Sequence, residues 1–170
     1  RPKRSPCDIP LQSLAWPHRV AFTNSIENLP MTQELTDATK ESTFALKRMV
    51  IKHIVDDQYG VFATGDMPDQ QMIGAYTGVL RAHPDKGAEY AMRISSETQD
   101  LCVDASTSGN QTRYINTHSE GLNNCESQMR EAEPLSIPIV RTTRCIRAGE
   151  QLFLDYGCAF KLPIGAPPLT

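Results

Sequence analysis

The segment from Arg113 to His118 carries the residues best suited to chemistry in this sequence. Asn116 and His118 have rigid, polar side chains that can donate and accept hydrogen bonds, and they stand close together in a stretch suited to lining a pocket. Later in the chain, an apolar segment ends in Tyr156, which adds a hydroxyl group. These residue types fit a binding pocket lined by polar groups, with a tyrosine nearby.

Several common catalytic patterns are absent from the sequence. It has no G-x-S-x-G elbow, no phosphate-binding P-loop and no H-E-x-x-H zinc motif. No G-x-G-x-x-G follows an expected strand, which argues against a Rossmann-type dehydrogenase or methyltransferase. The 4 histidines are far apart in sequence and form no metal-binding pattern, so we expect no metal ion.

The composition is that of one globular domain. A chain of 170 residues, 39% of them hydrophobic and 22% charged, is long enough to bury a core. No apolar run reaches the roughly 18 residues of a membrane span, and no signal peptide is visible. The 5 cysteines form no C-x-x-C pair, which argues against zinc and disulfides and for a reducing, intracellular compartment. The net charge of −3 disfavours nucleic acid and fits a basic peptide partner weakly.

The N-terminal part differs from the rest of the chain. Residues 1–43 are broken by prolines and then carry helix-compatible residues over 31–42, which predicts a loop followed by a short helix. From residue 44 onward, the pattern predicts short strands separated by turns, with an irregular tail over 158–170. The expected strands cover residues 46–55, 59–64, 72–80, 88–95, 101–104, 137–146 and 151–156. We therefore expect a mostly β fold, β-rich α+β in class, with its central domain over 44–157.

Five segments, in order along the chain, resemble motifs of the SET-domain family of protein-lysine methyltransferases. Residues 58–63 are similar to G-x-G-V-x-A, although Gln58 replaces the first glycine and makes the turn less permissive. Residues 74–78 match the strand motif E-Y-x-G around Tyr76, and Tyr90 aligns with a family tyrosine near cofactor and lysine. Taken alone, each tyrosine could be a core residue, so the order of the motifs carries the resemblance.

The fourth and fifth segments are the most specific. Three short runs that end at Asn116 match D-A…G-N-x-x-R-F-I-N. The family continues N-H-S-C-x-P-N, whereas here Thr117 stands between Asn116 and His118 and the proline is absent. Residues 149–157 are similar to G-E-E-L-x-F-D-Y-G and contain Tyr156. The segment in which the family inserts a variable subdomain is short in this chain.

This resemblance implies a SET-like fold of short curved sheets in which the C-terminal segment forms a pseudoknot. It also implies transfer of a methyl group from S-adenosylmethionine to a lysine ε-amine, with a basic histone tail as substrate and no metal. The zinc-binding cysteine clusters that flank many family members are missing, so the tail would help to close the lysine channel. The implied site residues are Tyr156 and Tyr76 for catalysis, Gln58, Tyr59, Gly60, Tyr90, Arg113, Asn116 and His118 for the cofactor, and Tyr76, Tyr90, Leu154 and Phe160 for the substrate channel.

Leu154 bears on how many methyl groups are added. In the family, the residue two positions before the catalytic tyrosine lines the lysine pocket, and a tyrosine there tends to limit the product to monomethyl-lysine. Leu154 has no hydroxyl and little bulk, which predicts di- or trimethylation. The alternative is that Leu154 belongs to the core and that Tyr76 or Tyr90 sets the pocket size.

Three alternatives to a histone methyltransferase remain open. The chain could be a SET-like module that binds a peptide or protein without catalysis, or it could methylate a non-histone protein such as a ribosomal one. It could also be an unrelated β-rich interaction domain. We expect a monomer that acts in a nucleus, either as a chromatin enzyme of its own cell or as a pathogen's effector in a host. Because the chain does not begin with Met, we expect a piece of a longer protein.

Overall fold

The fold is an assembly of short β-sheets around a short 3-10 helix, as seen in a computed structural model. Residues 17, 20–29, 32–33, 36–37, 47–56, 58–82, 89–94, 100–118, 121–131 and 135–156 are described. The elements are β1 (Ala21–Phe22), β2 (Ile26–Glu27), β3 (Met49–Val55), β4 (Gln58–Ala63), β5 (Met72–Ala75), β6 (Gly78–Ala82), β7 (Ala91–Ile94), β8 (Leu101–Asp104), β9 (Ser108–Gly109), the 3-10 helix η3 (Gln111–Tyr114), β10 (Cys125–Arg130) and β11 (Ile137–Thr142). The predicted mostly β, SET-like class is confirmed.

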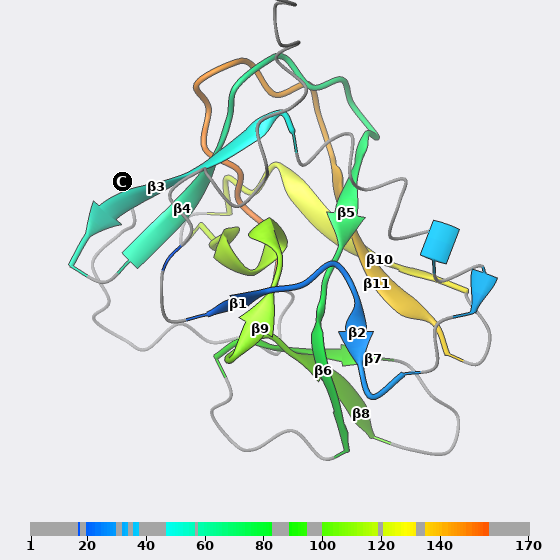
Figure 1. The fold of residues 1–170 in the computed structure, drawn as a ribbon. Helices are drawn as coiled ribbons and strands as arrows, with labels where there is room; N and C mark the ends of the chain where they lie inside the picture. Colours follow the sequence, from blue (N-terminus) through cyan, green and yellow to red (C-terminus); the bar gives the residue numbers. More distant parts are fainter. Residues whose placement is uncertain are drawn as a thin grey trace, which may run out of the picture.

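The strands form four small sheets, and η3 lies among them (Figure 1). Their orders are β10-β11-β5, β2-β6-β8-β7, β3-β4 and β1-β9. Neighbouring strands are antiparallel except in the pairs β1–β9 and β2–β6, which are parallel. The described residues contain no helix with the length and hydrophobicity of a membrane span.

The β3–β4 hairpin shows how the sequence pattern places one face of a two-stranded sheet against the core. Its strands are rich in Val and Ile, and inward-facing positions such as Met49, Ile51 and Val61 are buried. The left-handed conformation in the connecting turn falls on Asp56, with φ of 50°, a residue type that tolerates it. Gln58 begins β4 and is not among the positive-φ residues. The glycine that the family has at this position is therefore not required here by the backbone.

Residues 151–156, called the threaded segment below, pass between the two ends of a loop. On one side the Leu154 N–H donates to the Asn116 carbonyl oxygen at 2.8 Å. On the other side the Cys125 N–H donates to the Phe153 carbonyl oxygen at 2.9 Å, and Leu152 bonds to β4 through Val61. Because Asn116 and Cys125 flank the loop of residues 117–124, the segment runs through that loop. This arrangement is the predicted pseudoknot.

Two buried cores meet around the site. The first includes residues from β3, β4, η3 and the threaded segment, with Tyr59 and Tyr156 packed against it. The second includes Tyr76 and residues from β2, β5, β8 and β11. Met92, on β7, packs against both cores. The tyrosines named from the sequence thus lie on both sides of the junction between the cores.

Several expected boundaries were wrong. The expected strand over 72–80 is interrupted at Tyr76 and Thr77, which separate β5 from β6. Directly after this interruption, Gly78 comes so close to the backbone of Asp104 that a Cβ would lie 2.4 Å from its carbonyl oxygen. The expected strand over 137–146 ends at Thr142, and residues 151–156 form only single bridges instead of a regular strand. The pairing of β7 with β8 confirms the expected hairpin.

The N-terminal part contains two strands that the sequence did not predict. β1 and β2 lie where only a loop followed by a short helix was expected, and they pair with β9 and β6. Gln33, Thr36 and Asp37 are helical, which agrees with the expected short helix. β9 and β10 were also missed. Phe160 and the rest of the tail lie outside the described residues.

Candidate functional site

The first motif and the asparagine motif meet directly. The Asn116 Nδ2 atom donates to the carbonyl oxygen of Tyr59 at 2.8 Å. Asn116 also forms a parallel bridge with Phe153 of the threaded segment. Gly60, the residue after Tyr59, packs against the threaded segment. A Cβ at Gly60 would lie 2.6 Å from Gln151 Nε2, so a larger residue would displace that side chain. Segments that are far apart in sequence are therefore fixed against one another at Asn116.

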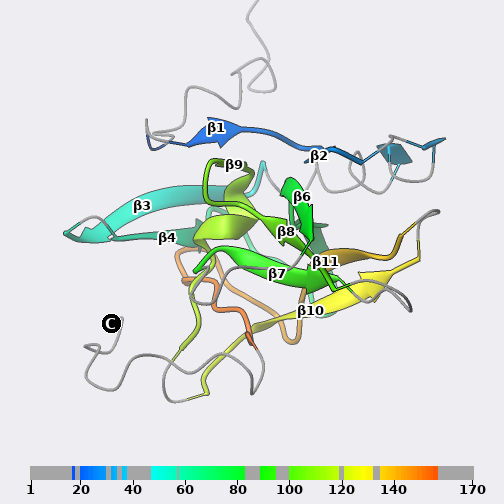
Figure 2. The same ribbon diagram turned by 90° about the horizontal axis from the view of Figure 1, so that it is seen from below.

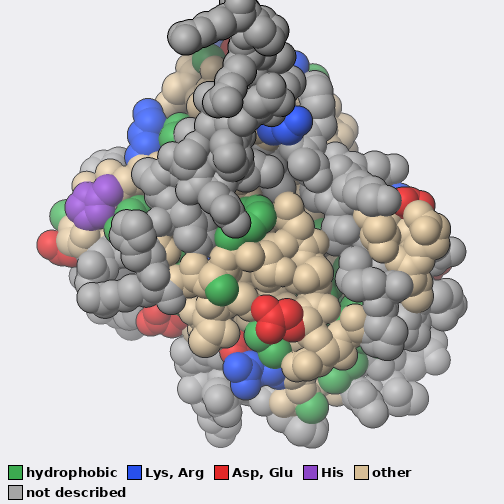
Figure 3. All heavy atoms as spheres, viewed as in Figure 1, with side chains coloured by type: hydrophobic (Ala, Val, Ile, Leu, Met, Phe, Trp, Pro, Cys, Tyr) green, Lys and Arg blue, Asp and Glu red, His purple; other side chains and the backbone are tan. Residues whose placement is uncertain are grey.

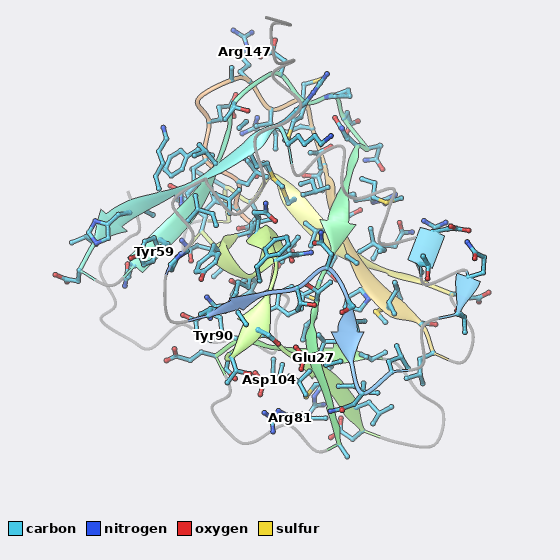
Figure 4. All side chains as sticks on the ribbon, viewed as in Figure 1. Glu27, Tyr59, Arg81, Tyr90, Asp104 and Arg147 are labelled. Carbon is cyan, nitrogen blue, oxygen red and sulfur yellow. The ribbon has the colours of Figure 1, made fainter. Side chains whose placement is uncertain are left out.

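A row of rings and one cation joins the cofactor-side residues. The rings of Tyr59 and Tyr114 lie edge to face at 5.9 Å, and the Arg113 guanidinium carbon lies 4.4 Å from the Tyr114 ring centroid. The same guanidinium carbon lies 4.1 Å from the Tyr90 ring centroid. Figure 4 labels Tyr59 and Tyr90 at the two ends of this row. Each contact of this type contributes a favourable cation–π or aromatic interaction.

Arg113 is a buried cation with a fixed charge. It is only 6% exposed, and its Nε atom donates to the Ala105 carbonyl oxygen at 2.7 Å. An arginine side chain carries a permanent positive charge in proteins. Aromatic faces and a carbonyl oxygen therefore stabilise a permanent positive charge close to Tyr90.

The hydroxyl groups of Tyr156 and Tyr76 are both anchored to the backbone. Tyr156 Oη donates to the Ile115 carbonyl oxygen at 2.7 Å, and Tyr76 Oη donates to the Tyr90 carbonyl oxygen at 2.9 Å. Burial raises the pKa of Tyr156 to about 12, with Tyr90 adding to the increase and Arg113 opposing it. The pKa of Tyr76 is raised strongly, first by burial and then by the neighbouring Tyr156. Both phenols therefore stay protonated and can act as hydrogen-bond donors at neutral pH.

His118 is held beside the threaded segment by its backbone and by its ring. Its N–H donates to Asn123 Oδ1 at 2.9 Å, and its ring lies edge to face on Phe153 at 4.9 Å. The extra residue Thr117 is accommodated between Asn116 and this contact. Asn116 and His118 thus both contact Phe153 of the threaded segment, one through its backbone and the other through its ring.

Leu154 and Gln58 occupy opposite environments. Leu154 is 1% exposed and belongs to the first core, where its N–H bonds to Asn116. Gln58 is exposed at the beginning of β4, next to Tyr59. The structure therefore brings Leu154 close to the asparagine motif but gives it a core environment. The role of Phe160 in the substrate channel stays a prediction, because Phe160 is outside the described residues.

Asn124 holds the threaded segment in place, although the sequence indicated no role for it. It is 1% exposed, its Nδ2 donates to the Gln151 carbonyl oxygen at 2.9 Å, and its Oδ1 accepts from the Phe153 N–H at 2.8 Å. One amide thus fastens two positions of the segment that ends in Tyr156. No local sequence signal marks this role, because only the threaded topology reveals the two partners of Asn124.

Asn110 has a similar role at the other motif. It is 1% exposed, and its Oδ1 accepts from the backbone N–H of Thr112 at 3.0 Å, which caps η3. Its Nδ2 donates to the Ala75 carbonyl oxygen at 2.9 Å. Asn110 therefore ties the helix that carries Arg113 to the end of β5, next to Tyr76. No group of three or more metal-binding side chains occurs among the described residues.

Comparison with known proteins identifies the family. The family model of the SET domain matches residues 58–157, which is more than half of the chain. The chain therefore belongs to the SET-domain family, as its motifs predicted. The histone-lysine N-methyltransferase EZH2 of Chaetomium thermophilum is 29% identical over 149 residues, which cover 75% of this chain and 10% of that protein. The chain thus spans only a small part of this relative.

Solved structures show the same fold. ATXR5 in complex with mono-methylated histone H3.1 superposes with a TM-score of 0.65 at 19% identity, covering 81% of both chains. The ATXR5 SET domain in complex with di-methylated histone H3 gives the same TM-score at 17% identity and the same coverage. At these identities the likeness establishes the fold alone.

Proposed function

We propose that this chain is an S-adenosylmethionine-dependent protein-lysine N-methyltransferase. The observation that carries the proposal is the convergence of three motif segments on two adjacent residues. The Ile115 carbonyl oxygen accepts a hydrogen bond from Tyr156, and the Asn116 side chain donates one to the backbone of Tyr59. The proposed catalytic hydroxyl and the proposed cofactor-binding turn are therefore both positioned by residues 115–116.

The aromatic rings and polar groups near Asn116 fit the proposed cofactor. Ring faces of Tyr59, Tyr90 and Tyr156 suit a sulfonium and a purine, because aromatic faces attract cations and stack on flat rings. With its Nδ2 committed to Tyr59, Asn116 offers its Oδ1 as an acceptor for an amino group. Gln58, Gly60, Arg113 and His118 complete the proposed cofactor set. When bound, S-adenosylmethionine would supply an electrophilic methyl group.

The surrounding residues favour a neutral lysine amine. Free lysine has a pKa of about 10.4, so an amine that is to react must lose its proton. Insertion between the Tyr76, Tyr90 and Tyr156 side chains would desolvate the ammonium and lower its pKa. The fixed charge of Arg113, which contacts the Tyr90 ring, would act in the same direction by like-charge repulsion.

Tyr156 and Tyr76 would orient the amine. Their hydroxyls are held by the carbonyl oxygens of Ile115 and Tyr90, so the phenol oxygens can still accept a hydrogen bond from an incoming amine. Fixed positions reduce the freedom that is lost on alignment of the reacting atoms. We assign Tyr156 and Tyr76 to catalysis, and Tyr76, Tyr90, Leu154 and Phe160 to the walls of the substrate channel.

The proposed substrate is a basic histone tail, and the proposed site of action is a nucleus. A histone-lysine methyltransferase relative and structural neighbours bound to histone H3 support this choice. The net charge of −3 is compatible with a basic peptide. We further propose that the chain acts as a monomer and requires no metal, with residues 44–157 as the catalytic domain, 1–43 as an extension and 158–170 as a tail.

A labelled-cofactor assay tests the proposal. The chain is incubated with methyl-labelled S-adenosylmethionine and a metal chelator, on core histones, on nucleosomes and on a ribosomal protein fraction. Mass spectrometry then locates the modified residue. We expect label on a histone lysine despite the chelator. Label on ribosomal proteins alone would overturn the histone assignment, and no label together with no cofactor binding by calorimetry would indicate a non-catalytic SET-like module.

A further inference from the structure

Residues 20–29, called the clasp below, lie outside the region that matches the SET-domain family and yet pair with it. β1 runs parallel to β9, and β2 runs parallel to β6. The Ala21 N–H donates to the Thr107 carbonyl oxygen, and the Thr23 N–H donates to the Gly109 carbonyl oxygen, each at 2.9 Å. Figure 2 shows β1 and β2 stretched across β9 and β6 on one side of the molecule. The clasp therefore joins two sheets that share no strand.

The residues between β1 and β2 contact two segments of the candidate site, one next to Tyr76 and the other at the start of η3. The Thr77 Oγ1 atom donates to the Thr23 carbonyl oxygen at 2.8 Å, and Thr77 directly follows Tyr76. The Asn110 Nδ2 atom donates to Asn24 Oδ1 at 3.3 Å, and Asn110 is the N-cap of η3. Thr77 and Asn110 are each 1% exposed. The donor side chains are thus buried, while their partners Thr23 and Asn24 are half-buried, and a buried donor that loses its partner is costly.

The clasp is also anchored by apolar side chains. Ile26 is 2% exposed and Leu29 is 8% exposed, and both belong to the second core together with Tyr76. Figure 3 shows acidic and basic side chains near the centre and in the lower part of this face. Figure 4 labels Glu27, the exposed residue of β2 in the clasp, together with Arg81 and Asp104. The clasp is therefore held by polar contacts of Thr23 and Asn24 and by the apolar side chains of Ile26 and Leu29.

We propose that Thr23 and Asn24 of the clasp are positioning residues for methyl transfer. They add a second connection, beside the direct Asn110–Ala75 hydrogen bond, between the segment that carries Tyr76 and the cap that begins η3. The helix η3 leads in turn to Arg113 and Asn116. The catalytic unit then extends N-terminally beyond the matched region to about residue 20. This inference rests on the proposed function for its activity readout, but its structural part does not depend on catalysis.

The test uses the full chain and the matched pair Thr77→Val and Thr77→Ser. Valine keeps the shape of threonine and removes the donor to Thr23, whereas serine keeps the donor. We expect Thr77→Val to lower kcat/KM between about tenfold and a hundredfold, because small misplacements of reacting groups have effects of this size. Thr77→Ser should restore most of the activity, and the exposed Glu27→Gln variant should match the wild type.

Hydrogen–deuterium exchange provides the readout that is independent of activity. Thr77→Val should increase exchange in residues 108–116, across the clasp contact, while β3 and β4 keep wild-type protection. If Thr77→Val does not fold, Asn24→Ala, at a half-buried position, serves for the same measurement. Wild-type exchange in residues 108–116 in the folded variants would overturn the positioning role. Increased exchange there in a protein with no methyl transfer would instead retain the clasp and reject the proposed function.

Discussion

The threaded segment and the clasp both hold parts of the candidate site, but they do so by different means. The threaded segment contributes Leu152 and Leu154 to the first core and bonds to β4, Asn116 and Cys125 through its backbone. The clasp pairs through two strands of two residues each, and residues 23–24 between these strands accept hydrogen bonds from the Thr77 and Asn110 side chains. The first is fixed mainly by backbone bonds on several sides, whereas the second is fixed by two short strands, two side-chain hydrogen bonds and two apolar side chains in the second core.

This difference separates stability from positioning. Removing a contact of the threaded segment leaves buried backbone groups without partners and should reduce the free energy of unfolding directly. Removing a contact of the clasp leaves the main core intact and should change the relative positions of Tyr76 and η3. Variants on the two sides are therefore expected to differ in whether stability or activity changes more.

The largest effect on stability is expected for Asn124→Ala. This change removes the donor to the Gln151 carbonyl oxygen and the acceptor for the Phe153 N–H. Both backbone groups would then be left unpaired within the pseudoknot. A buried group without a partner costs roughly 1–3 kcal/mol, so we expect a loss of about 2–4 kcal/mol in the free energy of unfolding. Urea denaturation measures it, with Gln128→Ala, at an exposed position of β10, as the control. Equal stability of the two variants would remove the special role of the pseudoknot.

Asn116→Ala should affect binding more than folding. The side chain makes one backbone contact, to Tyr59, and the proposed cofactor would use its remaining acceptor. Loss of one well-placed hydrogen-bonding group costs about 1–3 kcal/mol, which corresponds to a roughly ten- to a hundredfold weaker affinity. Calorimetric titration with S-adenosylmethionine measures the change, and circular dichroism verifies the fold. Wild-type affinity in a folded variant would place Asn116 outside the pocket.

High pH should destabilise both sides of the site. The folded-state pKa of Tyr156 is raised to about 12, and that of Tyr76 is raised in the same direction, whereas an unfolded tyrosine titrates near pH 10. The unfolded chain therefore loses these protons first, and the free energy of unfolding should fall as pH rises from about 10 to 12. Tyr156→Phe should reduce this fall. Urea denaturation at several pH values measures this fall. An equal decrease in the free energy of unfolding for the wild type and for Tyr156→Phe would contradict the burial of the hydroxyl.

Leu154→Tyr should produce the smallest effect on methyl transfer, a change of product, while overpacking at this buried position should lower the free energy of unfolding by about 1–3 kcal/mol. The added hydroxyl and bulk would restrict rotation of a methylated amine, so the product should shift from di- or trimethyl-lysine toward monomethyl-lysine. Mass spectrometry of a peptide at long reaction times measures the distribution. A wild-type protein that stops at one methyl group with excess cofactor would show that Leu154 is only a core residue.

The sequence was most informative where side-chain chemistry repeats a family pattern. It located the segments around Tyr59, Asn116 and Tyr156 and predicted the pseudoknot that brings them together. It also found the β7–β8 hairpin, because alternating apolar residues flank a polar turn. These features depend on local patterns or on the order of motifs.

The parts that were missed depend on long-range contacts. β1 and β2 are two residues each and exist only because β9 and β6 pair with them, so no local periodicity marks them. The partners of Asn124 are 27 and 29 positions away in sequence. The threaded segment was expected to be a regular strand, and its buried residues Leu152 and Leu154 do alternate with less buried ones. Its backbone nevertheless forms only single bridges, to Phe62, Asn116 and Cys125. Its environment could not be deduced without the topology.

The most direct test of the central claim is a parallel measurement of turnover and cofactor affinity for the wild type and for Tyr156→Phe. The substitution keeps the ring against the first core and removes only the hydroxyl that bonds to Ile115. Single-turnover methyl transfer to a histone substrate and calorimetric binding of S-adenosylmethionine are measured on the same preparations. We expect affinity to survive while turnover falls by orders of magnitude, which is the pattern of an interaction made in the transition state. Wild-type turnover in the Phe variant would contradict the assignment of Tyr156 as the catalytic residue.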